Sequence, residues 1–143
     1  MTRFASQLSR AALSTIVAVG LVGCSQTPVP TELKISPHEV ELTPETFEEL
    51  VHADTPVLVD FSAAWCGPCQ EVKPQVERLA ADREGSLVVA IADMTERDAV
   101  ANPIAEAWNV SGYPTFVLVR NGQELGRAIG APANLAEWVD SHL

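Results

Sequence analysis

The alternation of apolar and polar positions changes several times after residue 38, and five segments carry strand patterns. The first alternates over four residues, the next two are apolar runs rich in β-branched residues, and the last two flank Asn121-Gly122. Apolar runs of this length are typical of strands buried on both faces of a sheet, and Asn-Gly is a strong hairpin signal. The predicted strands are 39–42, 57–61, 87–92, 115–119 and 124–129.

Apolar residues at helical spacing predict four helices between and after these strands. The helices are expected from 44 to about 52, from the cysteine pair to about 83, over 98–108 and over 132–142. The order is therefore β-α-β-α-β-α-β-β-α. It predicts an α/β fold, with a central mixed sheet flanked by helices and an antiparallel hairpin at one end.

The N-terminal residues have the pattern of an export signal. Arg3 and Arg10 precede an uncharged run over 11–23, which is shorter than a typical membrane-spanning helix. Leu-Val-Gly-Cys at 21–24 resembles the lipobox of bacterial lipoproteins, in which the cysteine carries lipid. We therefore expect a signal peptide over 1–23, a lipidated tether over 24–38 and a single domain over 39–143. A spanning anchor and an ordinary signal with an incidental thiol are the alternatives.

Composition and charge restrict the partners of the domain. The 143 residues suffice for one domain, and the formal net charge of −10 becomes −12 if residues 1–23 are removed. So acidic a chain disfavours nucleic acid and anionic lipid as partners. The acids are spread along the chain, which favours a solvated surface, and we expect a monomer.

Two of the three cysteines, Cys66 and Cys69, are separated by Gly67 and Pro68. They could form a structural disulfide, half of a zinc site or a redox pair. A zinc site needs two more ligands, and a disulfide across so short a loop stabilises little. Cys66 falls where a buried strand gives way to a helix, which favours its thiolate, and Cys69 lies one turn further on. Gly67 permits close approach of a partner, and Pro68 suits an early helical position.

Three segments together resemble the thioredoxin family: VLVDFSAAWCGPCQ at 57–70, Ser-Gly-Tyr-Pro-Thr at 111–115, and Asn121-Gly122. The resemblance covers about residues 40–143 and implies the thioredoxin fold. It implies that Cys66 is the nucleophile, that Cys69 is the resolving thiol, and that Asp60 assists proton transfer at Cys69. Burial in an apolar strand should also raise the pKa of Asp60. A purely structural acid is the alternative.

The resemblance further implies a substrate-binding surface. Pro114 matches the family's cis-proline, which leaves the backbone of Tyr113 free to pair with an extended substrate. Trp65 would flank the reactive sulfur beside Gly67 and Pro68, although packing explains it equally well. Outside this surface, Trp108 and Trp138 are expected in the core, and the three histidines, His38, His52 and His142, on the surface.

Two departures from the family pattern concern the surroundings of Asp60. Ser62 stands where thioredoxins usually have an aromatic residue, and no lysine occurs over 87–92, where many thioredoxins have one. Segments 92–98 and 107–112 look closer to the C-terminal thioredoxin-like domain of DsbD-type electron transporters.

We therefore expect a lipid-anchored protein-disulfide reductase in the bacterial cell envelope, facing the periplasm or the outer side of the membrane. Its substrates would be protein disulfides, and its electrons would come from a membrane donor of the DsbD or CcdA type. No cofactor or metal is expected. The alternatives are a dithiol oxidase or isomerase, and a binding module of the same fold without a redox cycle.

Overall fold

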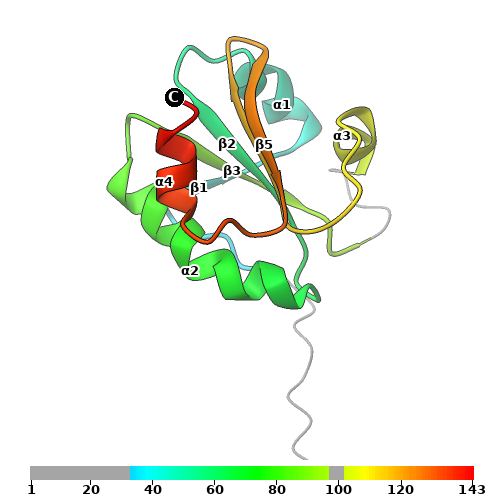
Figure 1. Ribbon diagram of the computed structural model, residues 1–143. Coiled ribbons are helices and arrows are strands. Elements are labelled where there is room, and N and C mark those ends of the chain that lie inside the picture. The colour runs from blue at the N-terminus through cyan, green and yellow to red at the C-terminus, as the bar shows by residue number, and fades with distance from the viewer. Residues whose placement is uncertain (1–32, 97–101) are drawn as a thin grey trace, which may run out of the picture.

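A five-stranded mixed sheet, in the order β1-β3-β2-β4-β5, forms the centre of the protein (Figure 1). The computed structural model describes residues 33–96 and 102–143. The expected signal peptide, Cys24 and most of the expected tether lie outside the described residues. The elements are β1 (Glu39–Glu41), α1 (Pro44–Val51), β2 (Val57–Ser62), α2 (Gly67–Asp82), β3 (Val88–Asp93), α3 (Asn102–Ala107), β4 (Thr115–Arg120), β5 (Gln123–Ile129) and α4 (Leu135–Asp140).

Strand β2 occupies the middle of the sheet, and all six of its residues are buried. It pairs in parallel with β3 and antiparallel with β4. The β4–β5 hairpin turns at Asn121 and Gly122, with φ angles of 52° and 75°. Two consecutive positive φ values are what a two-residue hairpin turn of the favoured type requires, which explains the Asn-Gly pair.

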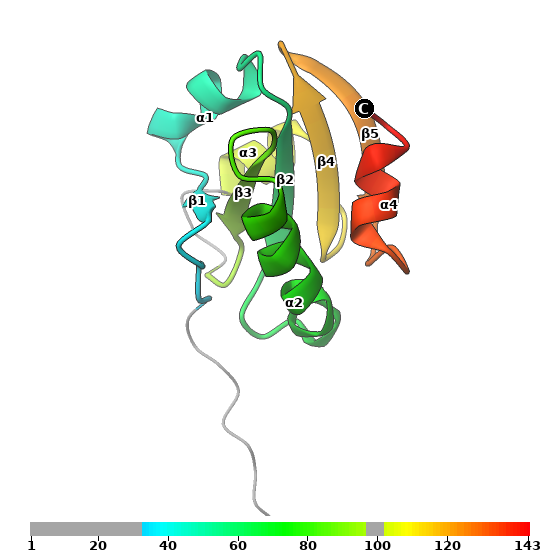
Figure 2. The same cartoon turned by 90° about the vertical axis from the view of Figure 1, so that its left-hand side faces the viewer.

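Apolar side chains cover both faces of the sheet. On one face, Val57, Val59 and Phe61 pack with residues of α1 and α3. On the other, Leu58, Val89 and Ile91 pack with α2 and α4. Figures 1 and 2 show these helices flanking the sheet. The expected element order and the mixed sheet with its C-terminal hairpin are confirmed.

The boundaries of the last helix were predicted wrongly. We expected it to begin at Pro132, but α4 begins at Leu135 because Asn134 has extended backbone angles and acts as its N-cap. The Asn134 side chain accepts a hydrogen bond from the amide of Glu137. A capping asparagine therefore starts this helix in place of the proline before it. For α3, the part of the predicted helix that falls on 98–101 lies outside the described residues.

Packing begins before β1, inside the segment expected to be a tether. Leu33 and Ile35 are partly buried and pack against the apolar cluster under α2. Ser36 and Glu39 are joined by a hydrogen bond from the Ser36 amide to the Glu39 carboxylate, 2.6 Å long. The last residues of the expected tether therefore rest on the domain.

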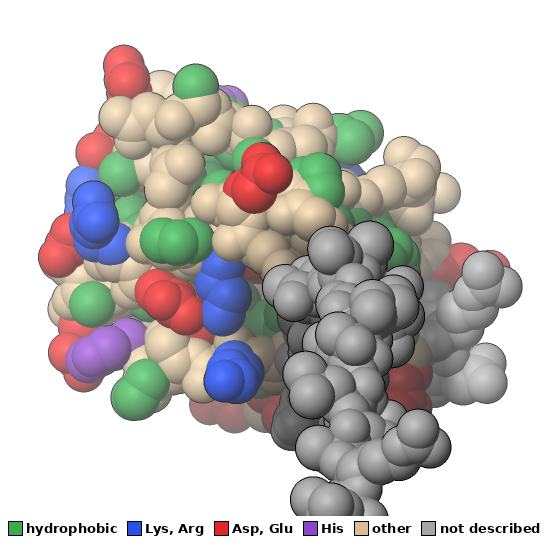
Figure 3. All heavy atoms as spheres, turned by 90° about the horizontal axis from the view of Figure 1, so that it is seen from below, with side chains coloured by type: hydrophobic (Ala, Val, Ile, Leu, Met, Phe, Trp, Pro, Cys, Tyr) green, Lys and Arg blue, Asp and Glu red, His purple; other side chains and the backbone are tan. Residues whose placement is uncertain are grey.

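Charged side chains of both signs are interspersed on the face seen in Figure 3, with hydrophobic side chains scattered among them. The mixture agrees with a solvated surface. Of the three histidines, His142 departs from expectation because it is half-buried, with its ring 4.7 Å from that of Trp138. Trp138 and Trp108 each pack, partly buried, against one of the two cores. Within the described residues, no helix combines the length and hydropathy needed to cross a bilayer.

Candidate active site

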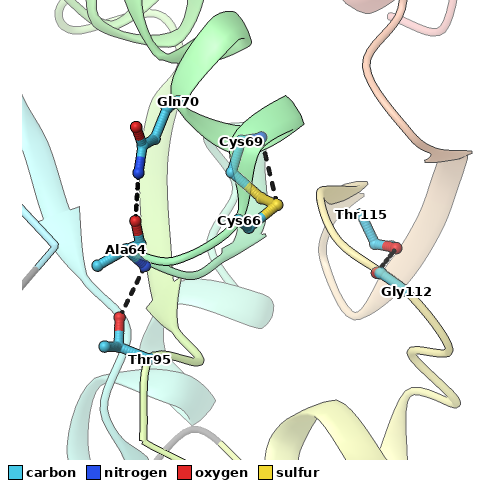
Figure 4. The surroundings of a disulfide bond; sticks show 7 residues. All are labelled: Ala64, Cys66, Cys69, Gln70, Thr95, Gly112 and Thr115. Carbon is cyan, nitrogen blue, oxygen red and sulfur yellow. Dashed lines mark hydrogen bonds between the residues drawn. A yellow bond between two sulfur atoms is a disulfide. The ribbon is translucent and has the colours of Figure 1, made fainter. Parts of the chain in front are cut away.

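Cys66 and Cys69 form a disulfide at the start of α2, with an S–S distance of 2.09 Å. Cys66 is the N-cap of this helix, and its sulfur accepts a hydrogen bond from the amide of Cys69 at 3.3 Å (Figure 4). The expected strand-to-helix junction is thus present, because β2 ends at Ser62 and α2 begins at Gly67. Helix amide groups and the helix dipole therefore favour negative charge on the Cys66 sulfur.

The two cysteines differ from the residues between them in exposure. Cys66 and Cys69 are 6% and 3% exposed, whereas Gly67 and Pro68 are exposed. A Cβ atom placed on Gly67 would meet nothing within 4 Å. The chain itself therefore leaves space beside Gly67. Pro68 lies in the first turn of α2, where its lack of an amide hydrogen costs no hydrogen bond.

The loop before Cys66 is held by two side chains that the sequence reasoning did not assign to the site. The Thr95 hydroxyl accepts a hydrogen bond from the Ala64 amide at 2.9 Å, and the Gln70 side-chain amide donates to the Ala64 carbonyl (Figure 4). The indole nitrogen of Trp65 donates to the Thr95 carbonyl at 2.9 Å. Asp93 in turn accepts from the Thr95 amide at 2.8 Å. The sequence Asp-x-Thr after a buried strand could have indicated this turn, because an aspartate side chain often accepts a hydrogen bond from the backbone amide two residues further on.

The loop that contains Tyr113 also contacts Trp65. The rings of Trp65 and Tyr113 are 5.9 Å apart in an edge-to-face arrangement, and Trp65 remains 51% exposed. Trp65 is therefore a surface residue next to Cys66 and not part of the core. The Tyr113–Pro114 peptide bond is cis, as the resemblance implied. The hydroxyl of Thr115 donates to the Gly112 carbonyl at 2.7 Å, closing this loop.

Asp60 is buried in β2, with 4% of its surface exposed. Burial raises the pKa of Asp60 to about 7, which agrees with the direction expected from the sequence. Its Oδ1 atom has no hydrogen-bond partner. Asp60 and Cys69 line one cavity of about 10 Å³, about the space that one water molecule needs. The structure therefore brings the buried acid and the second cysteine together.

Three neighbouring side chains modify the effect of burial on the Asp60 pKa. The Ser62 hydroxyl lowers this pKa, the negative charge of Glu39 raises it, and the positive charge of Lys73 lowers it. The two departures noted in the sequence thus have structural counterparts. A hydroxyl replaces the usual aromatic ring, and a cation reaches the site from helix α2 instead of strand β3.

Comparisons with known proteins agree with this geometry. Residues 38–141 match the thioredoxin family. The chain is 36% identical to thioredoxin from Chlorobaculum thiosulfatiphilum over 107 residues, which cover 72% of this chain and 94% of that protein. It is 38% identical to thioredoxin from Staphylococcus aureus over 107 residues, covering 73% and 97%. The chain belongs to the thioredoxin family.

Membership confirms the thioredoxin fold and, with the Cys66–Cys69 disulfide, identifies a thiol–disulfide oxidoreductase. The roles of Asp60, Trp65, Tyr113 and Pro114 remain predictions, although the structure gathers Asp60 with Cys69 and Tyr113 with Trp65. Within residues 33–96 and 102–143, no group of three or more His, Cys, Asp or Glu side chains is arranged to hold a metal ion.

Proposed function

We propose that this thioredoxin-family protein is a protein-disulfide reductase that works in the bacterial cell envelope from a lipid anchor. The observation that supports the catalytic half of the proposal is that the two cysteines have different surroundings. The Cys66 sulfur caps a helix, and Cys69 shares a small cavity with the buried Asp60. These surroundings favour the thiolate form of Cys66 and support transfer of the Cys69 proton to the Asp60 carboxylate.

The first half of the reaction uses Cys66. In the reduced protein, the thiolate of Cys66 attacks one sulfur of a client disulfide. A mixed disulfide forms, and the other client sulfur leaves as a thiolate that takes a proton from solvent. The exposed Gly67 and Pro68 and the half-exposed Trp65 leave room for an extended client segment beside the reacting sulfur. The backbone of Tyr113, before the cis proline, would pair with that segment.

The second half uses Cys69 and Asp60. The Asp60 carboxylate accepts the proton of the Cys69 thiol, directly or through one water molecule in the cavity that they share. The Cys69 thiolate then attacks the Cys66 sulfur and releases the reduced client as its second thiolate, which takes up a proton. The client gains two electrons, and Cys66 and Cys69 are left as the disulfide seen in the structure.

The cellular half of the proposal is supported by the N-terminal sequence. A basic segment, a short apolar run and Leu-Val-Gly-Cys at 21–24 have the order of a lipoprotein signal. An envelope compartment has no soluble reductant pool of its own, so the disulfide must be reduced again by a membrane donor, which we propose to be of the DsbD or CcdA type.

The experiment that tests this function is client trapping in intact cells. The Cys69→Ser variant should retain the nucleophile but lose the resolving thiol, so envelope proteins should accumulate as mixed disulfides on Cys66. Cys66→Ser is the matched control and should trap none. Mass spectrometry of the trapped species should identify exported proteins. Recovery of cytosolic proteins alone would refute the envelope assignment, and equal trapping by both variants would refute the role of Cys66.

A further inference from the structure

Glu39 is a buried acid for which the proposed reaction has no use. Its side chain has no exposed surface, although β1 lies at the edge of the sheet. One carboxylate oxygen, Oε2, accepts from the Ser36 amide at 2.6 Å, and the other, Oε1, has no hydrogen-bond partner. A buried carboxylate with an unsatisfied oxygen is costly to stability. Its presence at this position therefore calls for an explanation beyond packing.

Lys73 of α2 is the cation nearest to this acid. Its Nζ atom lies 3.7 Å from Oε2 of Glu39 and 3.3 Å from Oε1 of Glu77. The Lys73 side chain is 25% exposed, and that of Glu77 is 44% exposed. Lys73 thus links a fully buried acid to a partly solvated one. It also follows Cys69 by four residues, so it lies about one helical turn beyond the resolving cysteine.

The sheet register places Glu39 and Asp60 on the same face. Glu39 is aligned with Val89 of β3, and Asp60 is aligned with Ile91, two residues further along that strand. Residues two apart in a strand point to the same side, and Val89 and Ile91 both pack under α2. Lys73 lines the cavity that Asp60 and Cys69 share. Lys73 therefore pairs with one buried carboxylate and lines the cavity of a second one, which comes from a different strand.

We propose that Glu39 and Lys73 are positioning residues that control the charge state of Asp60, and through it the release of the client by Cys69. Lys73 favours the ionised form of Asp60. Glu39 disfavours the ionised form of Asp60. This inference rests on the proposed function, because the charge of Asp60 matters to catalysis through the proton of Cys69.

The other side chains around Asp60 are apolar, exposed or already paired, so Glu39 and Lys73 are the neighbouring charges that act on Asp60. Strand β4 places the apolar Phe116 opposite Asp60, and β3 places Ile91 there. Asp93, at the end of β3, is engaged with the Thr95 amide. Beyond these, Glu41 at the end of β1 is exposed, and Glu77 meets Lys73 on its outer side. The effects of Glu39 and Lys73 on the Asp60 pKa have the opposite signs that the proposal requires.

The test is a titration of the Asp60 carboxyl carbon by NMR in the oxidised full chain, purified in mild detergent. Glu39→Gln preserves the shape of the side chain and removes its charge, so the Asp60 midpoint should fall by about half a unit to one unit. Lys73→Gln should raise the midpoint by a similar amount, and Lys73→Arg should restore it. Glu77→Gln is the matched control, since it removes the exposed partner of Lys73, and it should change the midpoint by much less.

Midpoint shifts of opposite sign in Glu39→Gln and Lys73→Gln would show that these residues act on Asp60 through their charges. A merely structural role would shift the Asp60 midpoint of both variants in the same direction or not at all. The proposal is overturned if Glu39→Gln moves the midpoint no further than Glu77→Gln does. If Lys73→Gln does not fold, the comparison of Glu39→Gln with Glu77→Gln still decides, and amide spectra show which variants are folded. The titration needs no turnover, so its outcome is independent of whether the wild-type chain reduces a protein disulfide.

Discussion

Asp60 and Cys69 line the same small cavity although they come from different layers of the fold, the central strand β2 and the helix α2 that packs on it. This relationship gives the two cysteines different chemistry. The Cys66 sulfur accepts a hydrogen bond from the Cys69 amide at the start of the helix. Cys69 lies beside Asp60, whose pKa is raised to about 7 by burial. An acid with this pKa can both accept and return a proton near neutral pH.

Asp60→Asn should slow the resolving step. The carboxylate that accepts the Cys69 proton is lost, so we expect the rate to fall by about 10- to 100-fold at pH 8. In the wild type we expect this rate to rise with pH around 7, because the rise follows the ionisation of Asp60, and we expect the variant to lack that rise. Stopped-flow oxidation of the reduced protein by a small disulfide measures both effects. A variant that keeps the same pH profile would show that another group takes the proton.

Asp60→Asn should also stabilise the oxidised protein at high pH. Because the pKa of Asp60 is raised from 3.8 to about 7, the folded protein binds more protons than the unfolded chain between these values. The free energy of unfolding therefore falls as the pH rises through this window, by up to about 4 kcal/mol, and the contribution is constant above it. Asparagine removes the charge that has to be buried.

Urea unfolding at pH 4 and pH 8 measures this difference. The free energy of unfolding of Asp60→Asn should be clearly larger than that of the wild type at pH 8 and only slightly larger at pH 4. Asp82→Asn is the control, because it removes the same charge from an exposed position, where no burial has to be compensated. Equal stabilisation of the Asp60 variant at both pH values would contradict the account of its burial.

Thr95→Val should destabilise the protein by about 1 to 3 kcal/mol, the cost of leaving a buried amide without a partner. The amide in question is that of Ala64, a residue only 2% exposed, which donates to the Thr95 hydroxyl. Thr95→Ser keeps the hydroxyl and should cost much less. Urea unfolding of both variants checks this, and a Thr95→Val variant that is as stable as the wild type would show that the hydrogen bond to the Ala64 amide contributes little.

Cys24→Ser should move the protein from the membrane fraction to the soluble envelope fraction. The thiol of Cys24 is the expected attachment point of the lipid, and without acyl chains the acidic domain has little affinity for a membrane surface. Cell fractionation and immunoblotting measure the distribution, with Cys69→Ser as the control that should remain with the membrane. Retention of the Cys24 variant in the membrane fraction would refute lipid anchoring.

The order of the elements was predictable because its signals are local. The apolar run of β2, the Asn121-Gly122 turn and the Cys66 helix start are each read from a few adjacent residues. The start of α4 was missed because Pro132 and Asn134 are competing start signals, and sequence alone does not show that the Asn134 side chain caps the helix.

The surroundings of Asp60 were not predictable in the same way. Glu39 and Lys73 are 34 positions apart in the sequence, and they meet because β1 and α2 both pack against β3. Thr95 reaches Ala64 over a similar separation. Contacts of this kind depend on the folded sheet, so the pattern of apolar and polar residues carries little information about them.

Reduction of insulin by the full chain in mild detergent, with dithiothreitol as the electron source, tests whether Cys66 and Cys69 reduce a protein disulfide. We expect wild-type protein to precipitate the insulin B chain much faster than dithiothreitol alone, and Cys66→Ser not to exceed the dithiothreitol background. A wild-type chain that remains at that background while folded, as judged by its amide spectrum, would contradict the assignment of Cys66 and Cys69 as a working protein-disulfide reductase.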